Sequence, residues 1–454
     1  MHVILVEPPN DSDGYNDLRP SEGYIYPPLW ALCLATYLKN KALKIKVKVN
    51  ILDGQILNLS EINNIIRSIK PEIVGIGSMW VNYKNALAIA RQAKRCNSRV
   101  VIGGHHATGL AREILLNRGI YSDDYCIDVV VQGDGEKAFY EYAIGNPLHK
   151  IKNLVFQDEK TRVVKFNQTE FLNLDKLSFP DRNVVDVNNY FKHSPGSSNL
   201  SYKRMFSMYS KRGCGWRKLS NGGCIFCSRM DKGLRVKNPQ LVVNELNYLV
   251  TEFGADFIWD TSDNFFDSKG WFEKFYNLYK DYKLKPAMRI YARADNIDKD
   301  VVKKLNDLKI IQVALGLESG FQRNLLNMRK GITVNTNKKA VKILKMAGIS
   351  IIGNFIFGAP WEDKNSLKVS TDYIYQLIEL GMDIFWVYIL EPLPNSLAFQ
   401  LLKKKTGDKY KNIDLFDKYE VISDWVELFC EVSLSEILVA CRKLQKLPNH
   451  PGFR

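Results

Sequence analysis

Residues 205–228 read MFSMYSKRGCGWRKLSNGGCIFCS, an apolar run followed by three closely spaced cysteines. The apolar run predicts a buried strand, and Cys214, Cys224 and Cys227 follow beyond its end. Cys224 and Cys227 are separated by two residues, a spacing that lets one turn present two thiolates to a metal centre. A structural zinc ion, the alternative, needs a fourth Cys or His nearby, and the closest histidine, His193, lies in a stretch rich in Pro, Gly and Ser. Three thiolates on a cubane iron–sulfur cluster would instead leave one iron open to a chelating substrate.

The cysteines open a regular series of strands and helices. Strands are predicted at 205–209, 257–259, 288–291, 311–317, 349–355 and 384–388, and helices at 241–252, 271–281, 300–308, 336–346 and 366–380. Six strand–helix units predict a partial (β/α)6 barrel of the TIM type over residues 200–397. Residues 398–454 are basic and mixed, and we expect a small, mostly helical extension there.

A separate α/β series precedes the cysteines. Strands are predicted at 2–6, 47–52, 73–77, 99–103 and 127–131, with helices at 29–38, 60–69, 85–95 and 109–116. This alternation predicts a Rossmann-like, doubly wound parallel sheet over residues 1–145. Residues 146–199 contain a predicted hairpin around Asp158 and several Pro, Gly and Ser residues, and we expect them to link the two domains.

Three cysteines after the first strand of a six-unit partial barrel resemble the radical S-adenosylmethionine (radical SAM) enzymes. The common spacing in that family is three residues and then two, whereas the first gap here is nine residues, which predicts an enlarged cluster loop. The resemblance implies that Cys214, Cys224 and Cys227 are catalytic ligands of a 4Fe-4S cluster that binds S-adenosylmethionine. Phe226 matches the aromatic residue that precedes the third cysteine in the family, where its backbone contacts the adenine.

Polar turns at the later strand ends extend the resemblance. Trp259-Asp260-Thr261-Ser262-Asp263-Asn264 follows the second strand, where the family presents groups to the methionyl ammonium. Carboxylates and amide oxygens suit such a cation. Each of these segments taken alone could be an ordinary turn without a ligand, because Gly and Asp are common turn residues. The order of the segments across about 180 residues favours the barrel and its cofactor. The implied S-adenosylmethionine contacts are Asp260, Asp263, Asn264, Arg293, Glu318, Phe355 and Tyr388.

The first domain resembles the cobalamin-binding domain found ahead of many such barrels. Glycine-rich turns after its strands would let the backbone approach a large planar ligand. The domain lacks the Asp-x-His-x-x-Gly segment that supplies a histidine to cobalt in the cobalamin mutases, since Asp53-Gly54-Gln55 stands there instead. We therefore expect no cobalt ligand from that segment. The implied cobalamin contacts are Ser78, Gly103, Gly104, His105, Thr108, Gly133, Gly135 and Glu136.

By resemblance, the reduced cluster would cleave S-adenosylmethionine to a 5'-deoxyadenosyl radical, which abstracts a substrate hydrogen. Methylcobalamin could then supply a methyl group to an unactivated carbon of a small-molecule or natural-product substrate. One alternative keeps both domains but ends in ring closure or rearrangement, with cobalamin not acting as a methyl carrier. In a non-enzymatic alternative, the cluster is a structural or sensing centre, but the other cofactor-like turns would then have no role.

RNA modification is a further alternative, since the formal charge is +15. The RNA-modifying methylthiotransferases carry further cluster cysteines in their first domain, whereas Cys33, Cys96 and Cys126 lie in separate predicted elements and are interpreted as core residues. No run of five or more like charges marks a nucleic-acid-binding tail, so nucleic acid is not the expected partner.

Location and partners follow from simple patterns. No stretch reaches the roughly 18 apolar residues of a membrane span, and Met1 leads directly into an apolar run without a basic leader. We therefore expect a cytoplasmic protein. The basic excess and four aromatic residues, Trp80, Trp216, Trp361 and Tyr388, favour a planar or acidic substrate. The family resemblance implies an electron donor such as flavodoxin or ferredoxin.

Overall fold

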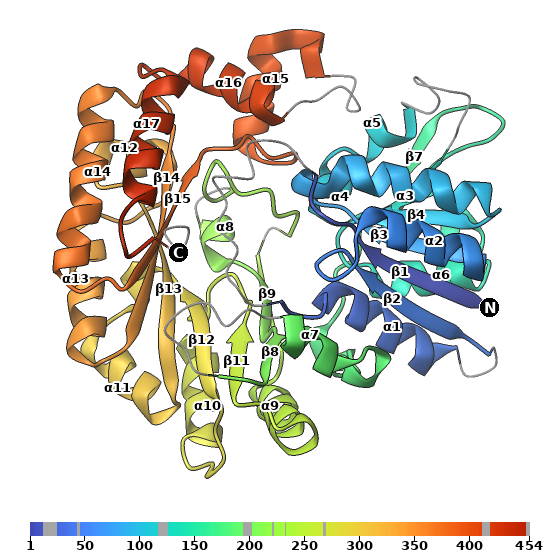
Figure 1. Cartoon of the computed structure of the whole chain (residues 1–454), viewed down its shortest axis with the longest axis horizontal. Coiled ribbons are helices and arrows are strands. Elements are labelled where there is room, and N and C mark those ends of the chain that lie inside the picture. The colour runs from blue at the N-terminus through green and yellow to red at the C-terminus, as the bar shows by residue number, and fades with distance from the viewer. Residues whose placement is uncertain are drawn as a thin grey trace.

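The first domain is built on a seven-stranded sheet with the order β2-β1-β3-β4-β5-β6-β7 (Figure 1). The computed structural model describes residues 1–11, 25–42, 46–116, 126–193, 202–219, 222–231, 233–266, 269–410 and 418–450. The five strands from β1 to β5 are parallel, as predicted. Their bounds are β1 His2–Glu7, β2 Lys48–Asp53, β3 Ile73–Gly77, β4 Arg99–Gly103 and β5 Val129–Val131.

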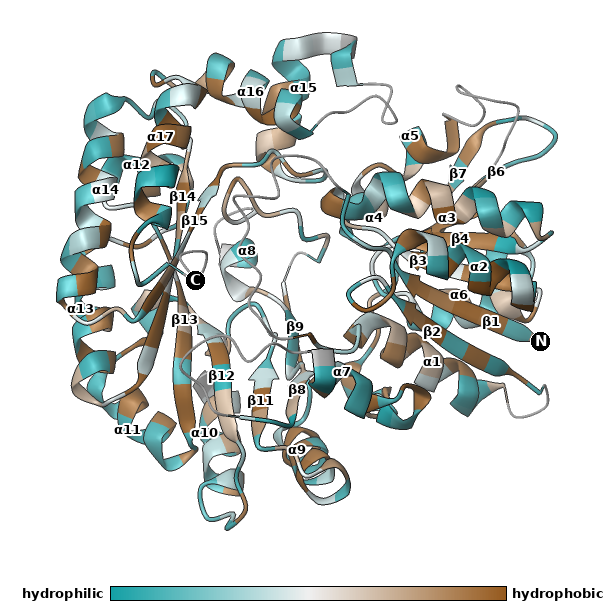
Figure 2. Cartoon of the chain, in the orientation of Figure 1, coloured by the Kyte–Doolittle hydropathy of each residue, from teal (hydrophilic) through white to brown (hydrophobic). Residues whose placement is uncertain are grey.

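Helices cover both faces of this sheet. Val3 and Leu5 of β1 pack against α1 (Leu29–Lys41) and α6 (Glu136–Ala143). Ile4 and Val6, which alternate with them, pack against the opposite layer, α2 (Leu59–Ile69) and α3 (Tyr83–Arg95). Because successive strand residues point to opposite faces, an apolar run buried on both sides is what a doubly wound sheet requires. Figure 2 shows the result as apolar strands between two-toned helices.

The predicted helix over 109–116 is interrupted in the structure. A short α4 (His105–Gly109) begins directly after Gly104, and α5 (Ala111–Leu116) follows it. Gly104 has a φ of +97°, a left-handed conformation that favours glycine, and a Cβ there would lie 2.5 Å from the Ser78 carbonyl oxygen. The tight turn therefore starts helical structure earlier than the apolar periodicity indicates.

The region between the domains extends the first sheet. The predicted hairpin around Asp158 is present as β6 (Leu154–Gln157) and β7 (Val164–Phe166), and both strands run antiparallel to their neighbours. After α7 (Val187–His193) the chain enters the second domain. Arg182, which is 1% exposed, donates from Nη2 to the Ser207 carbonyl oxygen at 2.6 Å, so this connection is packed against the barrel.

The second domain is the predicted partial barrel of six parallel strands in the order β15-β14-β13-β12-β11-β8. Its strands are β8 Met205–Met208, β11 Phe257–Asp260, β12 Ala287–Ala292, β13 Ile310–Glu318, β14 Ser350–Phe357 and β15 Ile384–Ile389. The outer helices are α9 Pro239–Phe253, α10 Lys269–Tyr279, α11 Lys299–Asp307, α13 Val334–Met346 and α14 Lys364–Glu379. Asn238, Asp298, Thr333 and Asp363 cap α9, α11, α13 and α14 by accepting backbone N–H bonds.

Two further features frame this barrel. A small antiparallel hairpin, β9 (Lys211–Gly213) and β10 (Leu234–Val236), follows β8 and was not predicted. The C-terminal extension is helical, as expected, and consists of α15 (Leu397–Thr406), α16 (Lys418–Phe429) and α17 (Leu434–Gln445). The last of these, α17, packs beside β15 and α14. Among the described residues, no helix is long and apolar enough to cross a membrane.

Candidate functional site

The three cysteines lie in the loop that connects the two strands of the β9–β10 hairpin. Cys214 follows β9 directly, and the short helix α8 (Gly215–Leu219) separates it from the other two. The Cys227 N–H donates to the Cys224 carbonyl oxygen at 3.1 Å, which closes the tight turn that the two-residue spacing predicts. The Ile225 N–H donates to the Met328 carbonyl oxygen at 3.1 Å, and the Ile225 carbonyl oxygen accepts from the Ala398 N–H at 3.0 Å. Both contacts anchor this turn to the barrel.

Arg217 reaches from α8 to the third cysteine. Its Nη1 donates to Cys227 Sγ at 3.1 Å. Gly223, with a φ of +83°, allows this approach, because a Cβ there would lie 2.8 Å from Arg217 Cγ. The nine residues between Cys214 and Cys224 therefore do more than bulge outward, since they bring a guanidinium to a cysteine sulfur.

Charged groups from the end of β13 and from the turn before α13 lie near Cys224. Burial raises the pKa of the Cys224 thiol to about 11, against a lowering effect from Lys330. Lys330 Nζ donates to Glu318 Oε1 at 2.6 Å, and both side chains are buried. Glu318 ends β13 with a φ of +61°, a backbone conformation that few non-glycine residues adopt. A thiol this basic loses its proton on metal binding.

Within the described residues, no three His, Cys, Asp or Glu side chains converge as the ligands of a single ion would. Each cysteine of a cubane cluster binds a different iron, so such thiolates stand farther apart than ligands of one ion. The donor set of three thiolates, with the cations Arg217 and Lys330 beside two of them, fits an anionic iron–sulfur cluster.

The end of β11 carries a buried, partly unpaired carboxylate. Asp260 is 1% exposed, and its Oδ1 accepts from the Ser262 N–H at 2.9 Å. Among the described residues, none forms a hydrogen bond with Asp260 Oδ2. A buried carboxylate oxygen without a partner is costly, and a ligand ammonium would satisfy it. This orphan oxygen fits the amine of S-adenosylmethionine.

The two neighbours of Asp260 that were also predicted to bind cofactor are engaged by protein groups. Asp263 forms an ion pair with Arg229, two residues after the third cysteine. Asn264 donates to Asn296 Oδ1 at 2.9 Å and accepts from the Phe266 N–H at 3.3 Å. Asn264 therefore stabilises its own turn.

Arg293 lies between the end of β12 and the cysteine loop. It donates to the Lys330 carbonyl oxygen at 3.0 Å, and its guanidinium stands 4.6 Å from the centre of the Trp216 ring. Gly331, with a φ of +68°, makes room for Trp216, because a Cβ there would lie 2.0 Å from that ring. These contacts dock α8 on the barrel mouth.

The three aromatic residues predicted to contact S-adenosylmethionine lie in different surroundings. Phe226 is half-buried against the main core, and Tyr388 is 38% exposed. Phe355 is fully buried, with its ring centre 6.4 Å from that of Tyr373 on α14. Its side chain therefore lies between strand and helix, because alternate strand residues face opposite sides of the sheet.

The carboxyl ends of the first sheet open into one cavity of about 480 Å³. All eight residues predicted for cobalamin line it, although they come from three separate turns: Ser78, Gly103, Gly104, His105, Thr108, Gly133, Gly135 and Glu136. Parallel strands bring such turns to one edge of a sheet. The Ser78 hydroxyl is buried there and has no hydrogen-bond partner within the described part of the chain, and Gly104 and Gly133 both have positive φ. An orphan hydroxyl and a glycine cradle fit a large ligand such as cobalamin.

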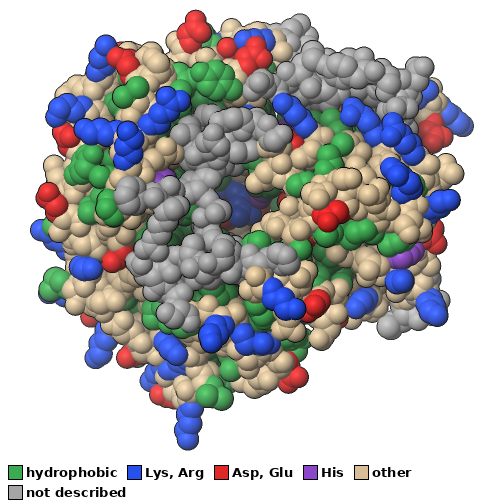
Figure 3. Space-filling model, in the orientation of Figure 1, with side chains coloured by type: hydrophobic (Ala, Val, Ile, Leu, Met, Phe, Trp, Pro, Cys, Tyr) green, Lys and Arg blue, Asp and Glu red, His purple; other side chains and the backbone are tan. Residues whose placement is uncertain are grey.

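The opposite wall of this cavity comes from the second domain, which was not predicted. It includes Arg212 of β9, Arg235 of β10 and the segment Arg229-Met230-Asp231 that follows the third cysteine. The space-filling view shows a hollow between the two halves of the molecule with a basic side chain inside (Figure 3). Proximity of this segment to Cys227 in the sequence was the available signal for its position.

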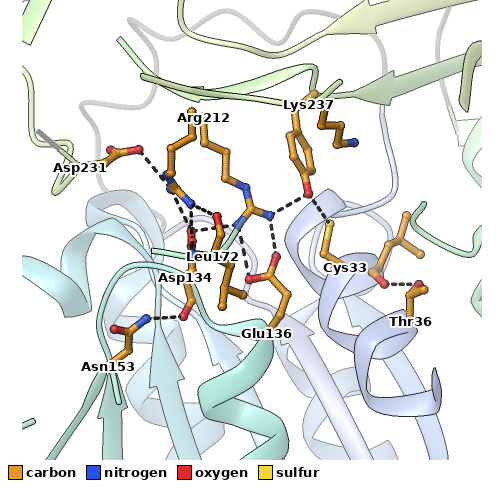
Figure 4. Close-up of polar contacts among 12 residues, drawn as sticks. Cys33, Thr36, Asp134, Glu136, Asn153, Leu172, Arg212, Asp231 and Lys237 are labelled. Atoms are coloured by element: carbon orange, nitrogen blue, oxygen red, sulfur yellow. Dashed lines mark hydrogen bonds and ion pairs between the residues drawn. The ribbon is translucent and has the colours of Figure 1, made fainter. Parts of the chain in front are cut away.

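Two residues predicted to bind cobalamin, His105 and Glu136, lie in this cavity beside charged groups. Burial, with a smaller contribution from Arg229, lowers the pKa of His105 to about 4, so the imidazole is neutral at pH 7. The Glu136 carboxylate accepts from Arg212 Nη2 at 2.5 Å. Glu136 therefore lines the cavity while it is held by an ion pair from the other domain (Figure 4).

Two family models match the chain. The model described as B12 binding domain matches residues 18–143, and the model described as Radical SAM superfamily matches residues 211–374. The chain is 26% identical over 431 residues to a protein named uncharacterized methyltransferase PH0819 from Pyrococcus horikoshii, covering 91% of this chain and 87% of that protein.

Solved structures share the whole two-domain fold. The radical S-adenosylmethionine methyltransferase TsrM from Kitasatospora setae, with cobalamin and a [4Fe-4S] cluster bound, matches with a TM-score of 0.69 at 16% identity. That match covers 90% of this chain and 78% of TsrM. The cobalamin-dependent S-adenosylmethionine radical enzyme OxsB, with aqua-cobalamin and S-adenosylmethionine bound, matches with a TM-score of 0.68 at 16% identity. The chain covers 61% of OxsB, and 89% of this chain is covered.

Proposed function

Because the chain belongs to the radical SAM enzymes that carry a B12-binding domain, we propose that it is a cobalamin-dependent methyltransferase acting on an unactivated carbon of a small molecule. The observation that carries this proposal is the shared cavity. Residues predicted to hold cobalamin line one wall, and the segment after the third cysteine lines the other. The likeness to a protein named as a methyltransferase over 91% of the chain supports transfer of a methyl group.

The cysteine loop would hold the 4Fe-4S cluster through Cys214, Cys224 and Cys227. When bound, the cluster supplies the electron that cleaves S-adenosylmethionine. Arg217 would donate a hydrogen bond to the Cys227 thiolate, and such bonds favour the reduced cluster. An electron donor such as flavodoxin or ferredoxin, in a reducing cytoplasm, would complete the system.

Asp260 would bind the methionyl ammonium of S-adenosylmethionine through its unpaired Oδ2. Arg293 and Glu318 lie at the neighbouring strand ends and would orient the rest of this cofactor, together with the backbone around Phe226. Arg293 already stacks on Trp216 and Glu318 already holds Lys330, so both would act from fixed positions. Asn264 is engaged by Asn296 and by its own turn, and Phe355 packs against Tyr373, so neither side chain is proposed to contact S-adenosylmethionine.

The turns of the first domain would bind cobalamin. When bound, cobalamin supplies the methyl group. Ser78 would offer its hydroxyl, and the positive-φ turns at Gly104 and Gly133 would let backbone approach the corrin ring. His105, neutral at pH 7, would act as a hydrogen-bonding group and not as a cation.

The interior of the barrel supports a planar or acidic substrate. Trp259 and Tyr291 lie with ring centres 5.7 Å apart, and Tyr388 is partly exposed on β15. Buried Arg289 stands with its guanidinium 5.2 Å from the Trp259 ring. Aromatic faces beside a cation suit a flat molecule that carries a negative charge.

The test is anaerobic reconstitution of the full chain with iron, sulfide and hydroxocobalamin, followed by S-adenosylmethionine and a chemical reductant. Formation of both 5'-deoxyadenosine and S-adenosylhomocysteine is the expected result. Deoxyadenosine without S-adenosylhomocysteine would contradict methyl transfer, and absence of both would contradict the radical mechanism.

A further inference from the structure

The β9–β10 hairpin forms the base of the cysteine loop. Residues 214–233 connect its two strands, and Gly213 and Leu234, which flank this loop, are paired in the register. The two ends of the loop lie very close together, because a Cβ on Gly213 would lie 2.1 Å from the Gly233 carbonyl oxygen. Contacts that fix the position of this hairpin therefore fix where the loop begins and ends.

Both strands of this hairpin are bound to one carboxylate of the other domain, that of Asp134. Arg212 and Arg235 are partners in the hairpin register. Arg212 Nη1 donates to Asp134 Oδ1 at 2.9 Å, and Arg235 Nη1 donates to Asp134 Oδ2 at 2.5 Å. Glu136 holds Arg212 from a second direction, as Figure 4 shows.

Asp134 itself is rigidly placed. Its side chain is 6% exposed, and Oδ2 also accepts from the Leu172 N–H at 2.8 Å. Burial alone would raise the pKa of Asp134, but Arg235 and Arg212 outweigh burial and lower it, so the carboxylate is charged. A charged carboxylate at this depth is stabilised by cations and hydrogen-bond donors, and the two arginines and the Leu172 N–H supply them.

The loop that begins and ends at this hairpin also completes the cobalamin cavity. Arg229, Met230 and Asp231 follow Cys227 by two to four residues and line the cavity wall. Met230 Sδ would lie 3.4 Å from a Cβ on Gly133, and Arg229 reaches Asp263 in the barrel. A cluster ligand at Cys227 is therefore only two to four residues from side chains that line the cobalamin cavity.

We propose that the cluster loop and the cobalamin cavity form one linked binding unit, with Asp134 as the positioning residue that couples them. The inference rests on the proposed function, because it concerns the same two cofactors. Ligation of the cluster orders the cavity wall, so the second ligand loses less conformational entropy when it binds. By linkage, each cofactor then raises the affinity for the other by the same factor.

The test compares the hydroxocobalamin dissociation constant of the full chain before and after anaerobic reconstitution of its cluster. We expect reconstitution to tighten binding by about fivefold or more in the wild type. Asp134→Asn keeps the shape but removes the charge, and we expect its factor to fall to about one. Glu170→Gln is the matched control, since Glu170 pairs with Lys137 and Lys152 on the same domain, and none of its described polar contacts is with the hairpin.

A ratio of affinities separates coupling from simple loss of fold, which would weaken both forms alike. If Asp134→Asn fails to fold, Arg235→Lys keeps the charge but loses the forked contact, and its factor should also drop below that of the wild type. A folded Asp134→Asn or Arg235→Lys protein that keeps the wild-type factor would overturn the proposal, as would a wild-type factor of one. A wild type that binds no hydroxocobalamin in either form would instead refute the cofactor itself, and the coupling with it.

Discussion

The cavity of the first domain and the cysteine loop of the second are assembled in different ways. The cavity is made from turns that follow neighbouring parallel strands, and all eight residues predicted for it line one space. The loop spans residues 214–233, and the β9–β10 hairpin at its base is held by arginine contacts with the other domain. Sheet topology alone places residues at strand ends, whereas a long loop takes its position from tertiary contacts. The two sites should therefore respond differently to substitution.

Removal of one cluster ligand should have the largest effect. Cys224→Ala leaves two thiolates, which cannot hold three irons of a cubane cluster. We expect loss of the iron–sulfur absorption and of 5'-deoxyadenosine formation, with hydroxocobalamin still bound through the first domain. Cys96→Ala, in a half-buried position of the first domain, is the control and should keep both. A Cys224→Ala protein with wild-type iron content and deoxyadenosine yield would refute the ligand assignment.

Removal of the Asp134 charge should destabilise the junction of the two regions. Asp134→Asn leaves two arginines without their shared partner, and we expect the free energy of unfolding at pH 7 to fall by about 3 kcal/mol. Arg235 and Arg212 lower the folded-state pKa of Asp134 despite its burial. The contribution is therefore fully present above the unfolded-state pKa of about 4 and is lost as the pH falls through the lower folded-state value.

Urea unfolding of wild type and Asp134→Asn at several pH values measures this difference. It should be constant from neutral pH down to about pH 5 and should shrink on further acidification. A difference that grows as the pH falls would contradict the ion-pair assignment.

Loss of the Ser78 hydroxyl should have a smaller effect that is confined to the cavity. Ser78 Oγ is buried without a partner in the free protein, so Ser78→Ala should change the unfolding free energy by less than about 0.5 kcal/mol. If this hydroxyl meets cobalamin, its loss should raise the hydroxocobalamin dissociation constant about fivefold. Ser98→Ala offers the opposite pattern, because Ser98 Oγ donates to the Pro71 carbonyl oxygen at 2.6 Å. It should lose stability and keep its affinity.

The smallest effect is expected from protonation of His105. Its pKa, lowered to about 4 chiefly by burial, leaves the imidazole neutral throughout the range in which an ordinary histidine titrates. Hydroxocobalamin affinity should therefore be equal at about pH 5.5 and pH 7, and His105→Gln should show the same ratio. Weaker binding to wild type at the lower pH, absent in His105→Gln, would show that His105 titrates normally.

The sequence was informative where periodicity and topology decide position. The six barrel strands, the doubly wound sheet and the strand-end turns all follow from alternation of apolar runs with helical patterns. The hairpin β9–β10 was missed because three-residue strands leave no periodic signal. Arg217, Arg229 and Arg235 were missed because their partners lie far along the chain or depend on loop geometry. Phe355 was predicted as a contact because a strand pattern does not say which face meets the cavity.

One measurement addresses the central claim, that cobalamin in the cavity lies close to the cluster, because the loop that carries the cluster cysteines also supplies the opposite wall of that cavity. Electron paramagnetic resonance of the holoenzyme can be recorded with cob(II)alamin alone, with the reduced cluster alone, and with both paramagnetic together. Two spins that lie close together interact, so the combined spectrum should be split or broadened relative to the sum of the two single spectra. A combined spectrum equal to that sum would place the cofactors in separate parts of the protein and contradict the claim.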